Sequence, residues 1–192
     1  MQARPLFRDV VPLLLAFAAL AAAALLLDAA LHLLRADWIG RYLGIPGALL
    51  ILTSFGYSLR KRKLIRFGRP VPLLRWHEGM AWAGSLLVLA HAGTRFNGML
   101  AWLAAGAMLI NVASGLTGKF LLDRARRRVD EARQRPREQG PPAEDLQERT
   151  YWDGLALDVV KQWRTVHLPI TLVFAVLASA HIVAELLFWA WK

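Results

Sequence analysis

The sequence predicts an all-α integral membrane protein, a haem-binding bundle of five membrane-spanning helices. Of its 192 residues, 56% are hydrophobic, a larger share than in an ordinary soluble domain. The mean hydropathy is +0.36 although 20% of the residues are charged, because the charges are concentrated between long apolar runs. Cysteine is absent, which excludes disulfides, thiolate metal sites, iron–sulfur clusters and a cysteine nucleophile.

Five apolar segments are each close to the roughly 20 residues that a helix needs to cross the hydrocarbon layer. They cover residues 10–34, 38–59, 74–94, 98–122 and 166–191. The first is too long for a cleavable signal peptide, so we expect a retained span. The second is the least regular, because Gly44, Pro46 and Gly47 interrupt its start. The chain is expected to form a single membrane domain over residues 1–192.

Lysine and arginine are distributed very unequally between the two sides of this five-span arrangement. Of the 24 basic residues, 20 lie in the N-terminus, in residues 60–75 or in residues 119–164. Positively charged loops stay in the cytoplasm. This predicts a multi-pass protein of the bacterial inner membrane, with a cytoplasmic N-terminus and a periplasmic C-terminus. The net charge of +10 is then explained by topology, and the expected partner is the lipid bilayer rather than nucleic acid.

The longest polar stretch, residues 123–165, is expected to be a cytoplasmic loop. Its first part is highly charged and ends in a Gly-Pro-Pro breaker at 140–142. Residues 151–163 then have the apolar periodicity of an amphipathic helix. Such a helix fits either the surface of an anionic membrane or a docking site for a cytoplasmic partner.

Four of the five histidines form two pairs with the same spacing. His77 and His91 lie in the third span and His167 and His181 in the fifth, each pair 14 residues apart. Fourteen residues are four turns of a slightly supercoiled helix, so both members of a pair face the same way, about 21 Å apart along the axis. Spans three and five run in parallel. His77 is therefore expected at the depth of His167, and His91 at the depth of His181, which predicts two six-coordinate haems stacked across the bilayer.

A proton relay or a zinc site fits these histidines less well than haem does. A relay would need more carboxylates beside them, and zinc would need three or four ligands around one point. The fifth histidine, His32, has no partner 14 residues away. We expect His32 to be a polar residue satisfied by a neighbouring helix. Because a chain without cysteine cannot attach haem covalently, both cofactors are predicted to be haem b.

Three arginines are candidate partners for the haem propionates, since guanidinium–carboxylate pairs are strong and directional. Arg75 and Arg164 precede His77 and His167 by two and three residues, where they could bind the inner, cytoplasmic haem. Membrane-surface anchoring is the alternative for these two. Arg95, four residues after His91, is the candidate for the outer haem.

Small residues are frequent in spans three and four. Gly79 and Gly84 would keep span three slim enough for a flat macrocycle to approach its backbone. In span four, Ser114, Gly115 and Gly118 are expected to serve helix packing or a bend rather than a ligand pocket.

The stretches 58–62, 72–79 and 89–91 read SLRKR, PLLRWHEG and LAH. Together with the histidine spacing they resemble the ferric reductase-like transmembrane domain, whose relatives include NADPH oxidases and the haem-binding membrane subunit of the bacterial methionine sulfoxide reductase system. The resemblance covers residues 38–191 and implies that the four paired histidines are haem ligands. The cytochrome b core shares this spacing. The chain departs from the family because no sixth span, flavin domain or GxGxxG loop follows, so the resemblance implies electron transfer through haem without NADPH oxidation.

The leading functional hypothesis is therefore a diheme b-type cytochrome subunit that carries electrons across the membrane. Its expected redox partner is a flavoprotein, a molybdoenzyme, a cytochrome c or the quinone pool. The alternative is an enzyme, a quinol/quinone oxidoreductase or a terminal metal reductase acting at a haem edge, with quinone as a further cofactor. Candidate polar residues for a quinone are Glu78, Asn97, Asn111 and Glu185. A haem-free membrane scaffold is the third hypothesis, and no catalytic residue is assigned.

Overall fold

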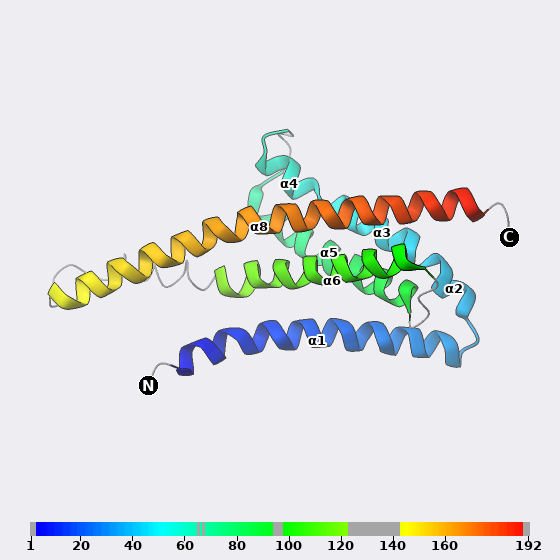
Figure 1. Ribbon diagram of the computed structural model, residues 1–192, viewed down its shortest axis with the longest axis horizontal. Helices are drawn as coiled ribbons and strands as arrows, with labels where there is room; N and C mark the ends of the chain where they lie inside the picture. Colours follow the sequence, from blue (N-terminus) through cyan, green and yellow to red (C-terminus); the bar gives the residue numbers. More distant parts are fainter. Residues whose placement is uncertain (1–2, 65, 67, 94–97, 123–142, 190–192) are drawn as a thin grey trace.

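The structure is a computed structural model that describes residues 3–64, 66, 68–93, 98–122 and 143–189, and over these ranges it contains helices and no strands. The elements are α1 (Ala3–Leu33), α2 (Asp37–Tyr42), α3 (Gly44–Ser54), α4 (Gly56–Lys61), α5 (Pro70–Ala92), α6 (Met99–Thr117), the π-helical turn η1 (Gly118–Leu122) and α8 (Ala143–Trp189). The long helices α1, α5, α6 and α8 lie side by side along the molecule (Figure 1). The predicted all-α class is confirmed.

Four helical stretches are long and apolar enough to cross a membrane: Val10–Leu33, Asp37–Lys61, Met99–Phe120 and Thr165–Phe188. Large apolar side chains face outwards over them. Leu26, Leu186 and Phe188, for example, are 68–71% exposed, as expected where lipid tails replace water. The third predicted span corresponds to α5, which is 23 residues long but is not among the four. Its charged residues and its two histidines lower its hydropathy.

The second segment is a helix with two breaks, at Leu43 between α2 and α3 and at Phe55 between α3 and α4. Pro46 explains the first break, because it has no N–H to donate to the preceding turn. At the second break, the hydroxyls of Thr53 and Ser54 donate to backbone carbonyls three residues earlier, over 2.8 and 2.6 Å. Such local bonds compete with regular helix geometry.

The closest helix contact lies between α3 and α5, which cross at Gly47 and Gly84. A Cβ atom on Gly84 would lie 2.8 Å from the carbonyl oxygen of Gly47, so neither position has room for a side chain. Ser54, Ser85 and Ala90 are only 2–3% exposed. Small residues allow the two backbones to approach closely, which is the usual way helices associate in membranes.

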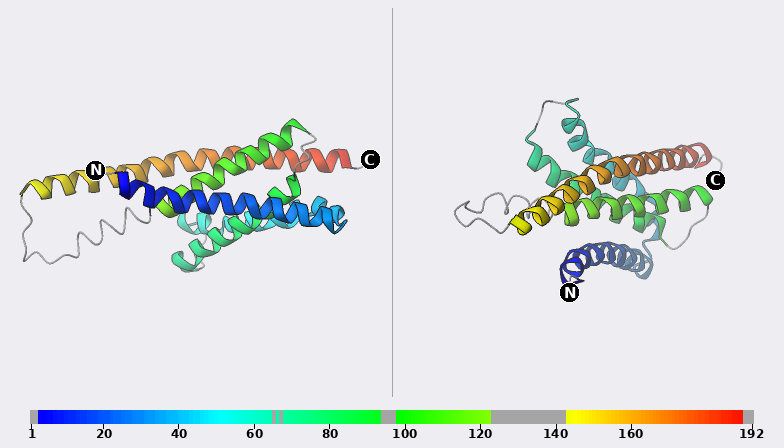
Figure 2. Two further views of the ribbon diagram at one scale, coloured as in Figure 1. Left: turned by 90° about the horizontal axis from the view of Figure 1, so that it is seen from below. Right: turned by 60° about the vertical axis from the view of Figure 1, so that its left-hand side comes forward.

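The other helices pack around this pair. α1 contacts α5, α6 and η1, and α6 contacts α8. α5 and α8 run in the same direction (Figures 1 and 2), but among the described residues each packs on other helices rather than on its parallel partner. The two helices that contain the histidine pairs are thus joined through α6.

The stretch predicted as a cytoplasmic loop with an amphipathic helix, residues 123–165, is described from Ala143 onwards. Residues 123–142 lie outside the described residues, but from Ala143 the chain is helical and continues as a single 47-residue helix through the fifth span. At about 1.5 Å per residue this helix is roughly 70 Å long, far longer than a membrane crossing. Its N-terminal part extends beyond the ends of α1 and α6 (Figures 1 and 2). The apolar part of this helix begins at Thr165, so the fifth predicted span and the polar segment before it belong to one helix.

Candidate functional site

His77 on α5 is held by the break between α3 and α4. Its Nδ1 donates to the carbonyl oxygen of Ser54 over 2.9 Å, and the ring of Tyr57 lies 5.9 Å away, tilted by 33°. Because a carbonyl can only accept, Nδ1 is the donating nitrogen. Nε2 makes no hydrogen bond within the described part of the chain.

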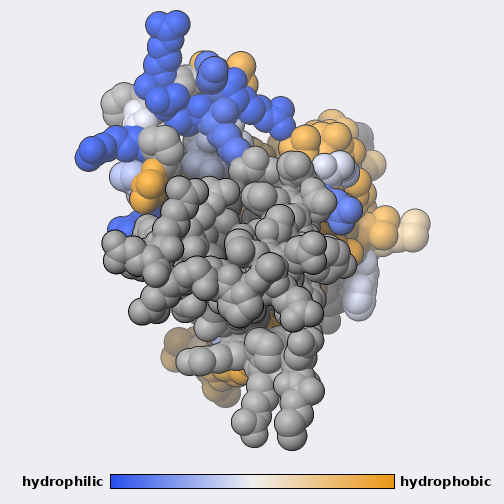
Figure 3. All heavy atoms as spheres, turned by 90° about the vertical axis from the view of Figure 1, so that its left-hand side faces the viewer, coloured by the Kyte–Doolittle hydropathy of each residue, from blue (hydrophilic) through white to orange (hydrophobic). Residues whose placement is uncertain are grey.

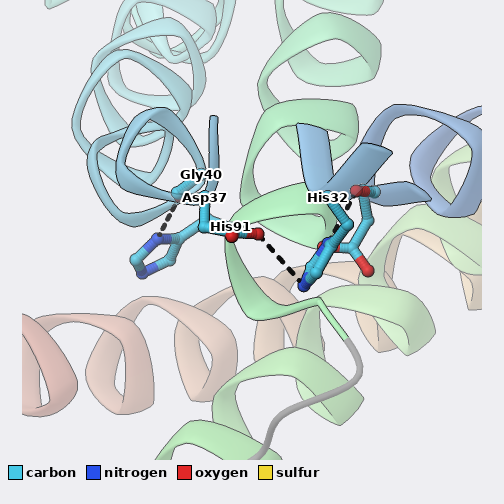
Figure 4. A network of polar contacts seen from close by, with 5 residues as sticks. His32, Asp37, Gly40 and His91 are labelled. Carbon is cyan, nitrogen blue, oxygen red and sulfur yellow. Dashed lines mark hydrogen bonds and ion pairs between the residues drawn. The ribbon is translucent and has the colours of Figure 1, made fainter. Parts of the chain in front are cut away.

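His91 is held in the same way by the break between α2 and α3. Its Nδ1 donates to the carbonyl oxygen of Gly40 over 3.1 Å (Figure 4). A Cβ atom on Gly44 would lie 2.8 Å from the His91 ring, so a glycine is needed where the imidazole meets the helix. Nε2 of His91 likewise makes no hydrogen bond to a described residue.

The register of the α3–α5 contact explains why both rings are held. His77 and His91 each lie seven residues from Gly84, and Ser54 and Gly40 each lie seven residues from Gly47. Seven residues are two turns of a supercoiled helix. Because α3 and α5 are antiparallel and cross at the two glycines, each histidine of α5 lies beside one break in the second segment. There the interrupted backbone offers a carbonyl oxygen for a side-chain donor.

On α8, His167 is held by α6. Its Nδ1 is hydrogen-bonded to the Ser114 hydroxyl over 2.9 Å, and the indole of Trp163 is stacked on the ring with centroids 4.9 Å apart and planes inclined by 15°. His181 is partly buried and makes no hydrogen bond to a described residue. Three of the four paired histidines are thus oriented through Nδ1.

We call His77 with His167 the first level, and His91 with His181 the second level. His77 and Lys61 act electrostatically on His167. No hydrogen bond or ring contact in the described structure joins the two histidines of either level, and both pairings stay predictions.

His32 differs from the other histidines because both of its ring nitrogens are engaged. Nδ1 donates to the Asp28 carbonyl oxygen over 2.8 Å, and Nε2 lies 3.3 Å from a carboxylate oxygen of Asp37 on α2 (Figure 4). Both ring nitrogens therefore face oxygen atoms of this chain, on α1 and on α2. The prediction that a neighbouring helix satisfies His32 is confirmed.

The remaining predicted site residues divide into three groups. Arg75 and Gly79 are exposed on α5, and a Cβ atom on Gly79 would meet nothing within 4 Å. Gly84, expected to face a macrocycle, instead packs against α3, where a Cβ would lie 2.7 Å from Cγ1 of Ile51; helix packing accounts for its small size. Arg95 and the side chain of Arg164 lie outside the described residues.

Two of the candidate quinone-binding residues already have partners. Glu78 forms an ion pair with Lys119 of η1 over 2.6 Å, and the side-chain oxygen of Asn111 accepts from Thr171 over 2.8 Å. Glu185 is exposed on α8, and Asn97 lies outside the described residues. These contacts stabilise the bundle and do not converge on one place.

Sequence reasoning missed the groups that orient the histidines. Gly40 and Ser54 act through backbone carbonyls, which have no side-chain signature. Ser114 was assigned to helix packing and Trp163 to an amphipathic surface. The recurrence of Gly40, Gly47 and Ser54 at intervals of seven, which mirrors the spacing on α5, was the available signal.

Within the described ranges, no three histidine, aspartate or glutamate side chains converge as a metal-ion site. The chain matches no family model, no characterised protein and no solved structure. Its function therefore has to be inferred from the paired histidines and the groups that hold them.

Proposed function

We propose that the chain is a diheme b-type cytochrome subunit of a redox system, which carries electrons across a bacterial inner membrane. His77 and His167 would bind one haem, and His91 and His181 the other. The two haems would supply a pair of one-electron carriers at two depths of the bilayer. The observation on which this proposal chiefly rests is the orientation of His77 and His91.

A histidine that binds a metal through Nε2 nearly always donates its Nδ1–H to a carbonyl, a carboxylate or water, which sets the tautomer and the ring plane. His77 and His91 donate in this way to the carbonyls of Ser54 and Gly40. A histidine that serves only helix packing has no need to keep Nε2 free in an apolar environment, where an unpaired polar atom is costly. His32, with both nitrogens engaged, shows how this chain satisfies a histidine without such a role.

The arrangement of the helices also fits two macrocycles. A macrocycle held by one histidine from each helix would need space between the two ligand helices. α5 and α8 meet this requirement, because they pack on α3 and α6 respectively. Next to His77, Gly79 leaves open space on the surface of α5.

We further propose that α5 also crosses the membrane, as a fifth spanning helix, with the N-terminus of the chain in the cytoplasm. Polar side chains are tolerated inside a membrane when they face protein and are paired. His77, His91 and Glu78 meet this condition through the carbonyls of the second segment and through Lys119. Side chains that are basic and exposed lie at the end of α4 and in the loop after it: Lys61, Arg62, Lys63, Arg66 and Arg69. Figure 3, a view of this end of the molecule, shows hydrophilic side chains gathered on one side of it.

The deciding experiment is a haem count on the purified full-length chain. A pyridine haemochrome assay should give two non-covalent haems b per chain, and the oxidised and dithionite-reduced spectra should show the bands of six-coordinate low-spin haem. A purified, folded chain without haem bands would instead support a membrane scaffold. Adding quinol or a ferric chelate while recording the haem bands would then separate an electron-carrying subunit from an enzyme that acts at a haem edge.

A further inference from the structure

The C-terminal end of α6 and the turn η1 form a small structural unit around His167. Ser114 and His167 are 53 residues apart in the chain, yet the serine hydroxyl and Nδ1 lie 2.9 Å apart in a partly buried place. This is the one side-chain hydrogen bond to a paired histidine among the described residues. Unlike the carbonyls that hold His77 and His91, it can be removed by a single substitution.

Trp163 completes the unit one helical turn before His167. Its Nε1 donates to the carbonyl oxygen of Ser114 over 2.8 Å, and its indole is stacked nearly parallel to the imidazole. Gly118, the first residue of η1, makes room for the indole, because a Cβ atom there would collide with the Trp163 ring. Ser114 therefore contacts both rings, the imidazole through its hydroxyl and the indole through its carbonyl.

Together these contacts restrain the imidazole in two independent ways. The hydroxyl determines which nitrogen faces α6, and the stacked indole limits rotation of the ring about its χ2 torsion. Nε2 makes no hydrogen bond to a described residue. No equivalent contacts are present at His181 in the described part of α8.

We propose that Ser114 and Trp163 are positioning residues that orient His167 as a ligand and lower the reduction potential of the haem at the first level. This inference rests on the proposed function. Coordination through Nε2 leaves the proton on Nδ1, which then donates to the Ser114 hydroxyl oxygen. A hydrogen bond of this kind makes the imidazole a more basic ligand and stabilises the oxidised, more positively charged iron.

The test is a redox titration of purified full-length variants, with the haem content of each measured in parallel. In Ser114→Ala the midpoint potential of the first-level haem should rise. If the hydrogen bond favours the oxidised over the reduced haem tenfold, the rise is about 59 mV. The second-level potential should not move. Ser114→Thr keeps the hydroxyl and should retain the wild-type potential.

Thr171→Val is the matched control. It removes a hydroxyl that bonds to Asn111 of α6 over 2.8 Å and to the backbone carbonyl oxygen of His167 over 2.9 Å. Neither bond involves a histidine side chain. It should leave both potentials unchanged. A second variant, Trp163→Phe, keeps an aromatic ring on the imidazole but loses the bond to Ser114. The low-spin ferric signal of the first-level haem in electron paramagnetic resonance should then shift or broaden, because that signal depends on the orientation of the axial rings.

The outcomes separate the two proposals. Two haems in every variant, with the same potentials in Ser114→Ala as in Thr171→Val, would overturn the positioning role and leave the diheme assignment intact. Selective loss of the first-level haem in Ser114→Ala, restored in Ser114→Thr, would support positioning even without a measurable potential. A wild-type chain without haem would overturn the proposed function, and this inference with it.

Discussion

The two levels of the histidine pairs are built differently. At the first level both rings are hydrogen-bonded, His77 to the α3–α4 break and His167 to Ser114, and each has an aromatic neighbour. At the second level His91 has a longer bond to Gly40, and His181 has no hydrogen bond to a described residue. The orientation of these rings depends on breaks and ends in the neighbouring helices, since within the described residues α5 packs chiefly on α3 and α8 on α6.

The largest effect is expected from removing the ligands themselves. His77→Ala and His167→Ala should each abolish the same haem, and His91→Ala and His181→Ala the other, so that every variant retains one haem per chain instead of two. Redox titration identifies which potential disappears. If His77→Ala and His181→Ala removed the same potential, the assignment of two levels would be wrong.

A substitution midway between the levels should affect both of them. In Gly84→Ala the new methyl group would lie 2.8 Å from the Gly47 carbonyl, which cannot move away without separating α3 from α5. Overpacking of this kind costs about 1–3 kcal/mol. We expect a lower thermal stability and partial loss of both haems.

Gly106→Ala on α6 is the control for that variant, because a methyl group there meets nothing within 4 Å. It should match the wild type in melting temperature and haem content. Loss of only one haem in Gly84→Ala would show that the two levels do not depend on a common crossing point.

The exposed basic residues after α4 should make reduction at the first level sensitive to charge. Neutralising Lys63 and Arg66 together to Gln should slow reduction by reduced flavin mononucleotide at low salt, by about tenfold or less. The difference should vanish as salt screens the field. Stopped-flow absorbance at the haem bands measures the rate.

Two comparisons isolate the contribution of these charges. Reduced riboflavin lacks the phosphate and should respond little to the double variant. Arg35 and Arg41 are exposed near the opposite end of the bundle, and their change to Gln should leave the flavin mononucleotide rate unaltered. Equal rates and equal salt dependence in wild type and the Lys63/Arg66 variant would mean that these side chains set membrane topology without steering a reductant.

The smallest effect on haem is expected at His32. His32→Ala removes the ion pair with Asp37 and should lower stability by no more than about 1 kcal/mol, because the pair is partly exposed. Both haems should remain, with unchanged potentials. Disappearance of either haem would make His32 a ligand and contradict the assignment of its two nitrogens.

The sequence alone was sufficient to predict the all-α membrane class and the two histidine pairs. Apolar runs of membrane length and a 14-residue spacing depend only on order along the chain and on the regular pitch of a helix. The same local reasoning also indicated that His32 would be satisfied by a neighbouring helix.

Only the tertiary structure decided what holds each histidine. Gly40 and Ser54 act through backbone carbonyls that become acceptors only where the second segment breaks beside α5. Ser114 and Trp163 reach His167 from positions that are 53 and four residues away in the chain. Gly84, expected to face a macrocycle, packs against Gly47 of α3. Hydrogen bonds and close backbone contacts join groups that are distant in the sequence. Which groups meet depends on how the helices cross, and this cannot be predicted from local periodicity.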